Sequence, residues 1–126
     1  MAIIDKRRLD DTESPVAVGL IGDVRDRDAL LIDDEIASGG TMIEAARFLR
    51  AHGARRIEAA AVHPVLSGRA VERLQASAIE RLIVTNTIPL RPDIPRDKIE
   101  VISVARLFAE AIHAIHSGDS VSKLFA

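Results

Sequence analysis

The sequence predicts an α/β fold in which a parallel sheet is flanked by helices on both faces. Three observations support this fold class. Apolar runs that suit buried strands alternate with stretches of helical periodicity along the chain. Residues 29–32 are apolar without alternation, which is typical of a strand covered on both faces. Polar residues follow several of the predicted strands, and open α/β sheets bind ligands at the carboxyl ends of their strands.

The strands are predicted from short apolar runs. In chain order they lie at residues 2–5, 17–21, 29–33, 57–62, 79–84 and 101–103. The alternation of these runs with helices predicts a mostly parallel sheet.

Two helices are predicted between these strands. The apolar residues from Met42 to Leu49 fall at i, i+3, i+4 and i+7, which places them on one face of a helix that Gly53 can end. Ser67 is positioned to cap a short helix whose apolar residues lie within 70–74.

The last predicted helix has the clearest amphipathic pattern of the chain. Its apolar stripe consists of Val104, Leu107, Phe108, Ala111, Ile112 and Ile115. Ser103 is the expected N-cap, and Gly118 lies just past the end of the helix.

Composition limits the possible classes of protein. The 126 residues, of which 48% are hydrophobic and 29% charged, predict one globular domain over residues 1–126. A net charge of −2 argues against a general attraction to nucleic acid. With three Phe and no Trp or Tyr, a stacking platform for bases is not expected either. The absence of cysteine excludes disulfides and thiolate metal sites.

The sequence shows no signal for a membrane or for secretion. No apolar run approaches the ~20 residues of a membrane-spanning helix. The N-terminus lacks the basic region and long apolar core of a signal peptide. We therefore expect a cytoplasmic protein without a membrane partner.

The segment after the third predicted strand carries the pattern of a phosphate site. Gly39 and Gly40 permit a tight turn before a helix, whose unpaired N–H groups and partial positive charge favour a phosphate. Ser38 and Thr41 add hydroxyl groups at the same turn. The alternative is an ordinary helix cap, since the run lacks the Lys of a P-loop.

Two carboxylates precede this turn. Asp33 and Asp34 supply hard oxygen ligands for Mg²⁺ or acceptors for sugar hydroxyls. Successive strand residues point to opposite faces, so the pair serves one ligand only if the strand has already ended. Otherwise one carboxylate caps the next helix or pairs with a basic residue. Together with the phosphate turn, the pair predicts a site for a phosphorylated sugar.

Residues 29–42 resemble the phosphoribosyl diphosphate (PRPP) loop of phosphoribosyltransferases, an apolar strand followed by Asp-Asp-x-x-Asp-Thr-Gly/Ala-Gly-Thr. Two positions depart from that pattern. Ser38 replaces a Thr and keeps the hydroxyl, whereas Ala37 replaces the third Asp, which lies near the reacting sugar carbon in many relatives.

Other segments resemble one subgroup of this fold, the ribose-phosphate diphosphokinases (PRPP synthases). In family order they are residues 2–8 (AIIDKRR), 21–24 (IGDV), 61–68 (AVHPVLSG), 85–89 (TNTIP) and 120–125 (SVSKLF). These matches cover nearly the whole chain, which resembles the C-terminal half of such a synthase without the N-terminal half.

The resemblance implies a type I phosphoribosyltransferase-like fold, ribose 5-phosphate or PRPP and ATP as ligands, Mg²⁺ as cofactor, and a homo-oligomer. It also assigns Lys6 and Arg8 to neutralise the transferring diphosphate. Strand geometry would place these two cations on one side of the chain, although a solvated charge cluster is the alternative.

Three readings of function follow. The first is diphosphoryl transfer from ATP to ribose 5-phosphate, giving PRPP and AMP. The second is a phosphoribosyltransferase that consumes PRPP, for which the chain shows no obvious base-binding hood. The third is a non-catalytic half-protein that binds sugar phosphate or pairs with a full-length synthase. His63, before Pro64, is either a site residue or a packing or hydrogen-bonded histidine at a strand end.

Overall fold

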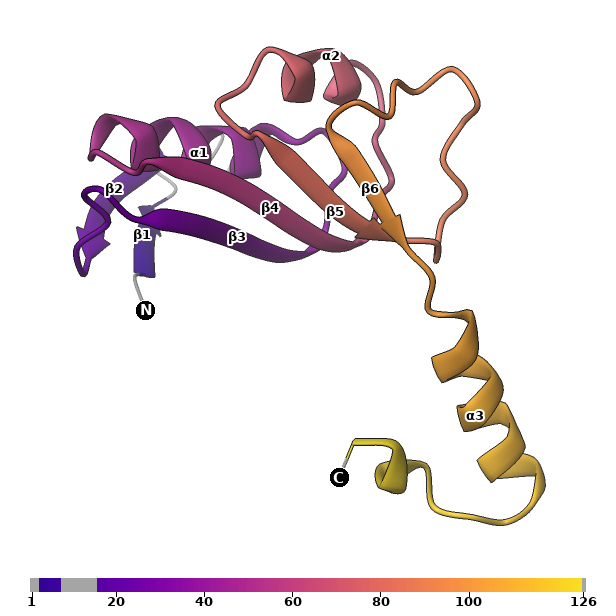
Figure 1. Ribbon diagram of the computed structural model, residues 1–126. Helices are drawn as coiled ribbons and strands as arrows, with labels where there is room; N and C mark the ends of the chain where they lie inside the picture. The colour runs from indigo at the N-terminus through magenta and orange to yellow at the C-terminus, as the bar shows by residue number, and fades with distance from the viewer. Residues whose placement is uncertain (1–2, 8–15, 126) are drawn as a thin grey trace.

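The computed structural model describes residues 3–7 and 16–125, with side chains described from residue 22 onward (Figure 1). The elements, in chain order, are β1 (Ile3–Arg7), β2 (Val16–Ile21), β3 (Asp28–Glu35), α1 (Gly40–Ala51), β4 (Arg56–His63), α2 (Ala70–Gln75), β5 (Arg81–Thr85), β6 (Ile99–Ile102), α3 (Ala105–His116) and the 3₁₀ helix η1 (Val121–Phe125).

A parallel sheet of four strands forms the body of the molecule. The strands lie in the order β3-β4-β5-β6, and every neighbouring pair is parallel. Because the strands are parallel, the carboxyl ends of β3, β4 and β5 lie along one edge of the sheet. The predicted α/β class with a parallel sheet is confirmed.

The core lies between the sheet and helices α1 and α2. Both helices cover the same face of the sheet (Figure 1). The largest fully buried side chains are Ile57, Pro64, Leu66, Leu74, Ile79, Leu82 and Val84. Aliphatic side chains fill this layer, as the scarcity of aromatic residues requires. The apolar face predicted for α1, from Met42 to Leu49, is buried as expected.

The opposite face of the sheet is open, although the sequence predicted helices on both faces. Ile32 is 77% exposed and Leu30 is 54% exposed, because the side chains of β3 alternate between the covered and the open face. No described helix lies across this face, which is the underside of the sheet in Figure 1. The unbroken apolar run at residues 29–32 therefore marks a strand with two apolar faces, of which the described helices cover one.

The first two strands form a sheet of their own. β1 and β2 pair in antiparallel fashion and do not join the parallel sheet, a separation that the predicted run of strands did not indicate. β2 packs near α1. An apolar run indicates a strand but not its partner, since pairing depends on contacts between residues far apart in the sequence.

Helix ends follow the predicted signals in part. Gly53 has a φ of 88° directly after α1, where the amide of Ala54 donates to the carbonyl of Leu49 at 3.0 Å. The predicted Ser67 cap is wrong, because α2 begins after Arg69 without a side-chain cap. The backbone N–H of Ser67 instead donates to the carbonyl of Ala37 at 3.0 Å.

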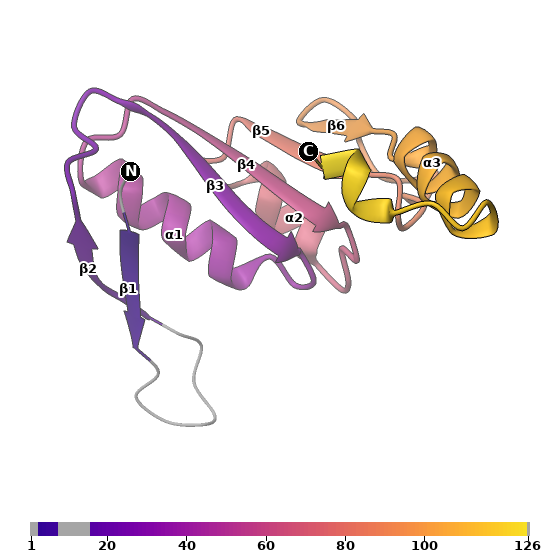
Figure 2. The same ribbon diagram turned by 90° about the horizontal axis from the view of Figure 1, so that it is seen from below.

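Helix α3 forms where it was predicted but leaves the body of the molecule (Figure 2). It starts after Val104, one residue later than a Ser103 cap would give, while Ser103 Oγ still accepts the N–H of Ala105 at 3.3 Å. Its main packing partner in the described chain is η1. None of the described helices has the length and apolar character needed to cross a bilayer.

A surface ion pair joins the starts of β3 and β4, and we predict that it makes a small, pH-dependent contribution to stability. Arg55 Nε and Nη2 donate to the two carboxylate oxygens of Asp28 at 2.9 and 3.0 Å. The hydrogen bond from Arg55 lowers the pKa of Asp28 below its ordinary value of 3.8. A carboxylate with a lowered pKa stabilises the fold above its unfolded pKa and loses that effect as the pH falls through the folded one.

Asp28→Asn should therefore lower the urea midpoint slightly at pH 7 and leave it unchanged near pH 2. The change should be small because the pair is exposed to solvent. Urea titrations of both proteins at the two pH values measure it. A difference between the proteins that persisted at pH 2 would contradict this assignment.

Candidate functional site

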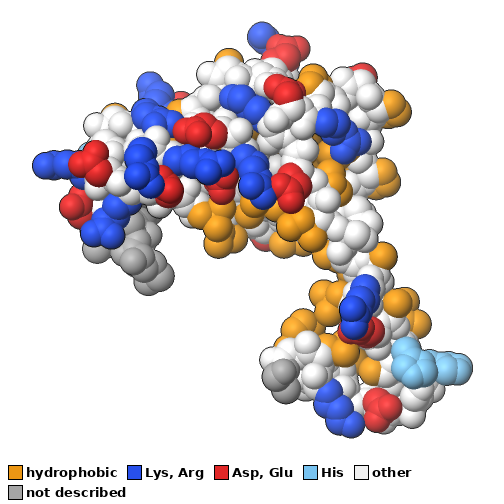
Figure 3. Space-filling view, viewed as in Figure 1, with side chains coloured by type: hydrophobic (Ala, Val, Ile, Leu, Met, Phe, Trp, Pro, Cys, Tyr) orange, Lys and Arg blue, Asp and Glu red, His pale blue; other side chains and the backbone are white. Residues whose placement is uncertain are grey.

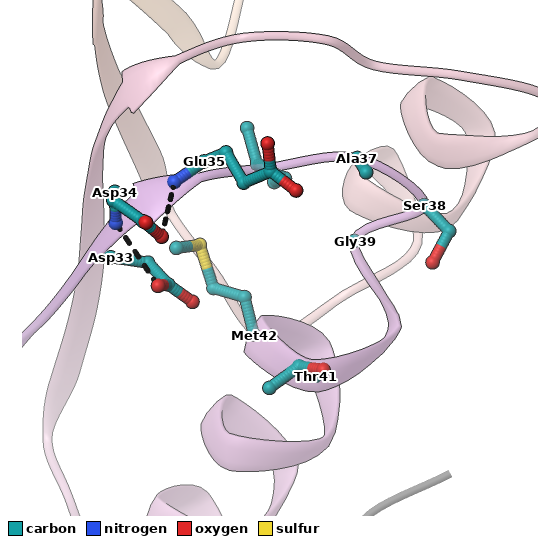
Figure 4. A pocket seen from close by; sticks show the side chains of 9 residues that line it. Asp33, Asp34, Glu35, Ala37, Ser38, Gly39, Thr41 and Met42 are labelled. Carbon is teal, nitrogen blue, oxygen red and sulfur yellow. Dashed lines mark hydrogen bonds between the residues drawn. The ribbon is translucent and has the colours of Figure 1, made fainter.

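Strand β3 carries the two predicted carboxylates to the carboxyl edge of the sheet. Asp33 and Asp34 line one open cavity of about 240 Å³ together with the turn before α1 (Figure 4). The backbone N–H of Asp34 donates to Asp33 Oδ1 at 3.0 Å, and that of Glu35 donates to Asp34 Oδ1 at 2.9 Å. These bonds turn both side chains along the chain, so the pair shares a cavity even though β3 continues to Glu35. The second oxygen of each carboxylate has no hydrogen-bond partner among the side chains and backbone that the structure describes.

Glu35 is a cavity residue that the sequence analysis did not single out. It lines the same hollow as the two aspartates, so three consecutive carboxylates surround it. The sequence does indicate this role, because Glu35 directly follows Asp34. Since β3 extends to Glu35, it brings a third acidic side chain to the edge of the sheet.

The turn that follows β3 is held in place by the next crossover. The N–H of Ile36 donates to the carbonyl of His63 at 3.0 Å, and the N–H groups of Leu66 and Ser67 donate to the carbonyls of Ile36 and Ala37, also at 3.0 Å. Ile36 is buried in the core. These bonds fix the start of the turn before any ligand arrives, which is the preorganisation that a binding site requires.

The residues of the turn line the cavity and carry backbone N–H groups without an acceptor among the described residues. Gly39 is the N-cap of α1 with a left-handed φ of 74°, a conformation that favours glycine. The N–H groups of Ser38 and Gly39 find no acceptor among the described residues, and those of Thr41 and Met42 belong to the first helical turn, where no intrahelical partner exists. Ser38 Oγ accepts the N–H of Gly40 only at a long 3.5 Å. Of the five N–H groups from Ser38 to Met42, only that of Gly40 has an acceptor among the described residues, so the other four can bind an anion.

The acidic residues fit a magnesium ion that is shared with a ligand. Among the described residues, no three His, Asp or Glu side chains are arranged to hold a metal ion by themselves. Mg²⁺ commonly uses one or two carboxylates and completes its shell with water and substrate phosphates. Within the same described part, Asp33 and Asp34 form no ion pairs that would compete for such an ion.

The predicted basic residues are not brought to the site by what the structure describes. Lys6 belongs to β1, with a register irregularity between Asp5 and Lys6, but its side chain lies outside the described part. Arg8 lies outside the described residues altogether. Their role remains a prediction.

A second hollow lies at the carboxyl ends of β4 and β5. It is lined by His63, Asn86, Thr87, Val104, Ala105 and Phe108. His63 Nδ1 lies 3.0 Å from Thr87 Oγ1, and the hydroxyls of Thr85 and Thr87 both donate to the carbonyl of Val62. His63 is therefore an exposed, hydrogen-bonded residue at a strand end that also lines this hollow, and both of its interpretations stay predictions. In the sequence, residues 85–89 are informative only through their resemblance to the family motif. Their hydrogen bonds to β4 join residues more than twenty positions apart, which sequence spacing does not predict.

A glycine turn at a helix start, with adjacent carboxylates, thus lies at the carboxyl edge of a parallel sheet, the arrangement of a phosphoribosyltransferase-like fold. A family model described as "Phosphoribosyl synthetase-associated domain" matches residues 7–126. The chain belongs to this family.

Individual relatives agree with the family assignment. The chain is 53% identical to a ribose-phosphate pyrophosphokinase from Caldanaerobacter subterraneus and 48% identical to one from Helicobacter hepaticus. Both alignments cover 99% of the present chain. It also resembles the crystal structure of phosphoribosylpyrophosphate synthetase from Mycobacterium smegmatis, with a TM-score of 0.76 and 37% identity over 86% of this chain and 35% of that one. The chain spans only 39% and 40% of the lengths of the two pyrophosphokinases.

Proposed function

We propose that this chain is the C-terminal, sugar-phosphate-binding domain of a ribose-phosphate diphosphokinase. In that reaction the 1-hydroxyl oxygen of ribose 5-phosphate attacks the β-phosphorus of ATP. The bond between the α,β-bridging oxygen and the β-phosphorus breaks, AMP leaves, and the hydroxyl proton is lost, giving PRPP. The names of the relatives and the motifs shared along the chain support this reaction over consumption of PRPP.

The observation that carries the proposal is the turn between β3 and α1. Ser38, Gly39, Thr41 and Met42 lie at the start of a twelve-residue helix and line the same cavity as the carboxylates. We assign the 5-phosphate to this turn, with Gly40 keeping the backbone close to the ligand and Thr41 adding a hydroxyl.

The carboxylates of β3 serve the sugar end of the same ligand. Asp33 and Asp34 would accept hydrogen bonds from the ribose hydroxyls, either directly or through a Mg²⁺ ion that they hold. When bound, the ion supplies positive charge that neutralises polyphosphate oxygens. Lys6 and Arg8 are proposed to stabilise the diphosphate in transfer, since such chemistry depends mainly on positioning and charge.

The test is the binding of ribose 5-phosphate to Asp34→Asn. We expect this variant to bind about tenfold more weakly than the parent chain, because an amide accepts fewer hydrogen bonds and carries no charge. Titration calorimetry with and without Mg²⁺ measures the difference. Asp93→Asn is the matched control, because Asp93 is an exposed carboxylate that pairs with Arg91 outside the cavity.

Ala37→Asp separates a direct sugar contact from a metal contact. An added carboxylate in this turn should leave affinity without Mg²⁺ unchanged or slightly weaker, and should strengthen its dependence on Mg²⁺. If Asp34→Asn binds like the parent chain under both conditions, the carboxylate pair is a structural cap and the proposed sugar site is wrong.

A further inference from the structure

The start of the turn before α1 is held by residues 64–67, the clamp segment, which follows β4. The N–H of Leu66 donates to the carbonyl of Ile36 at 3.0 Å, and the N–H of Ser67 donates to the carbonyl of Ala37 at the same distance. Two consecutive N–H groups thus bond two consecutive carbonyls. A regular strand cannot make this pair of bonds, because successive N–H groups of an extended chain point in opposite directions.

The backbone of Leu66 makes this pair of bonds possible. Its φ is 44°, in the left-handed region, where neighbouring N–H groups of the chain can turn to the same side. Among the described residues, only Asp26 and Leu66 combine a side chain with a positive φ. An Asp can support this conformation by a local hydrogen bond, whereas a leucine has no such means. Glycine would adopt the same φ without strain, so the leucine at this position calls for another reason.

The reason is the burial of the Leu66 side chain. Leu66 is 1% exposed and belongs to the hydrophobic core. The described chain does not bury every large apolar side chain, since Ile32 is 77% exposed and Figure 3 shows hydrophobic side chains gathered along the underside of the body. A strained backbone persists where the surrounding structure holds it in place. The core therefore anchors Leu66 in its left-handed conformation.

The clamp segment also orients an N–H group of the turn. The described residues contain no cis peptide bond, so each N–H points opposite to the carbonyl of the preceding residue. The bond that holds the carbonyl of Ala37 thus directs the N–H of Ser38 to the side of the turn away from the clamp segment. Ala37 and Ser38 line the sugar-phosphate cavity, whereas the clamp segment contributes none of its lining.

We infer that Leu66 is a positioning residue for phosphate binding. Its anchored, left-handed backbone holds the carbonyls of Ile36 and Ala37, and through them it sets the N–H of Ser38 before the ligand arrives. The inference rests on the proposed function, in which this turn binds the 5-phosphate. It adds a buried leucine that lies outside the cavity to the groups on which that binding depends.

The first test compares Leu66→Val with Leu66→Met in titration calorimetry with inorganic phosphate and with ribose 5-phosphate. Valine is branched at Cβ and opposes a left-handed backbone, whereas methionine is unbranched there and conserves the volume of leucine. Leu66→Val should bind both ligands about three- to tenfold more weakly, as the loss of one hydrogen bond would give. Leu66→Met should bind them like the parent chain.

The matched control is Leu74→Val. Leu74 is 0% exposed, as deeply buried as Leu66, but it belongs to α2 and takes no part in the clamp segment. This variant should lose stability in urea unfolding and keep the affinity of the parent chain. An equal loss of affinity in Leu74→Val and Leu66→Val would overturn the inference, because both losses would then follow from stability alone.

The second test examines the clamp segment without a ligand. In Leu66→Val the amide of Ser67 should exchange its hydrogen faster and the amide resonance of Ser38 should shift, while Leu74→Val changes neither. If Leu66→Val does not fold, Leu66→Gly takes its place. Glycine permits the left-handed backbone but removes the anchor, so both readouts should change in the same direction.

Two further results separate the inference from the proposed function. If Leu66→Val exchanges faster at Ser67 but binds phosphate like the parent chain, the clamp segment opens without effect on the ligand, and the inference is wrong. If the parent chain binds neither phosphate nor ribose 5-phosphate, the proposed function itself is overturned, and the inference that rests on it falls as well.

Discussion

Gly39→Ala should weaken the binding of phosphate and of ribose 5-phosphate by at least about tenfold, while the same change at Gly118 leaves binding intact. Gly39 has a φ of 74°, and a Cβ at this position would lie 3.3 Å from Ile43 Cδ1. A non-glycine residue in the left-handed region costs about 1–2 kcal/mol, and the turn relieves that strain by rotating its N–H groups away from the cavity. Losing one or two charge-assisted hydrogen bonds to a phosphate accounts for a tenfold change.

The control isolates geometry at the site from loss of stability. Gly118 has nearly the same φ, 73°, with no atom within 4 Å of an added Cβ, and it lies beyond α3. Both variants should therefore lose a similar amount of stability in urea unfolding, but only Gly39→Ala should lose affinity in phosphate titrations followed by the amide resonances of Ser38 and Met42. Equal affinities for the two variants would show that the turn does not bind the phosphate.

The site could be predicted from the sequence because its parts are local. A strand, two carboxylates, two glycines and a helix start follow one another between residues 28 and 51, so their spacing alone brings them to one place. The doubt over whether Asp33 and Asp34 share a cavity could not be settled in the same way. It depends on two hydrogen bonds from the following N–H groups, which no spacing rule contains.

The errors in the fold have the opposite origin. The residues of α3 and β1 were placed in the correct kind of element, but the strand partner of β1 and the packing of α3 were not predicted. Whether β1 pairs with β2 or with β3, and whether α3 turns back after β6, is decided by contacts between segments far apart in the chain. Periodicity shows that a surface is apolar, and it does not show what covers that surface.

The open face also affects how the proposed activity should be tested. Diphosphoryl transfer needs ATP and the pentose held in line, with cations at the transferring group. The two described cavities are the glycine turn with its acidic residues and a second hollow whose lining includes His63 and Phe108. Neither cavity, as described, combines a slot for adenine with basic side chains for a triphosphate.

We therefore predict that the 126-residue chain alone binds ribose 5-phosphate. It should release AMP from ATP at least about a thousandfold more slowly than a full-length relative, because most of the rate comes from positioning and charge stabilisation. The measurement is AMP release from ATP with ribose 5-phosphate and Mg²⁺, with the Caldanaerobacter subterraneus pyrophosphokinase, which is 53% identical to this chain, as the positive control. Calorimetry on the same sample must show that the sugar phosphate is bound. A low rate then reflects an incomplete nucleotide site and not an unfolded protein. AMP release within tenfold of the control would contradict the prediction and show that residues of this chain complete the ATP site.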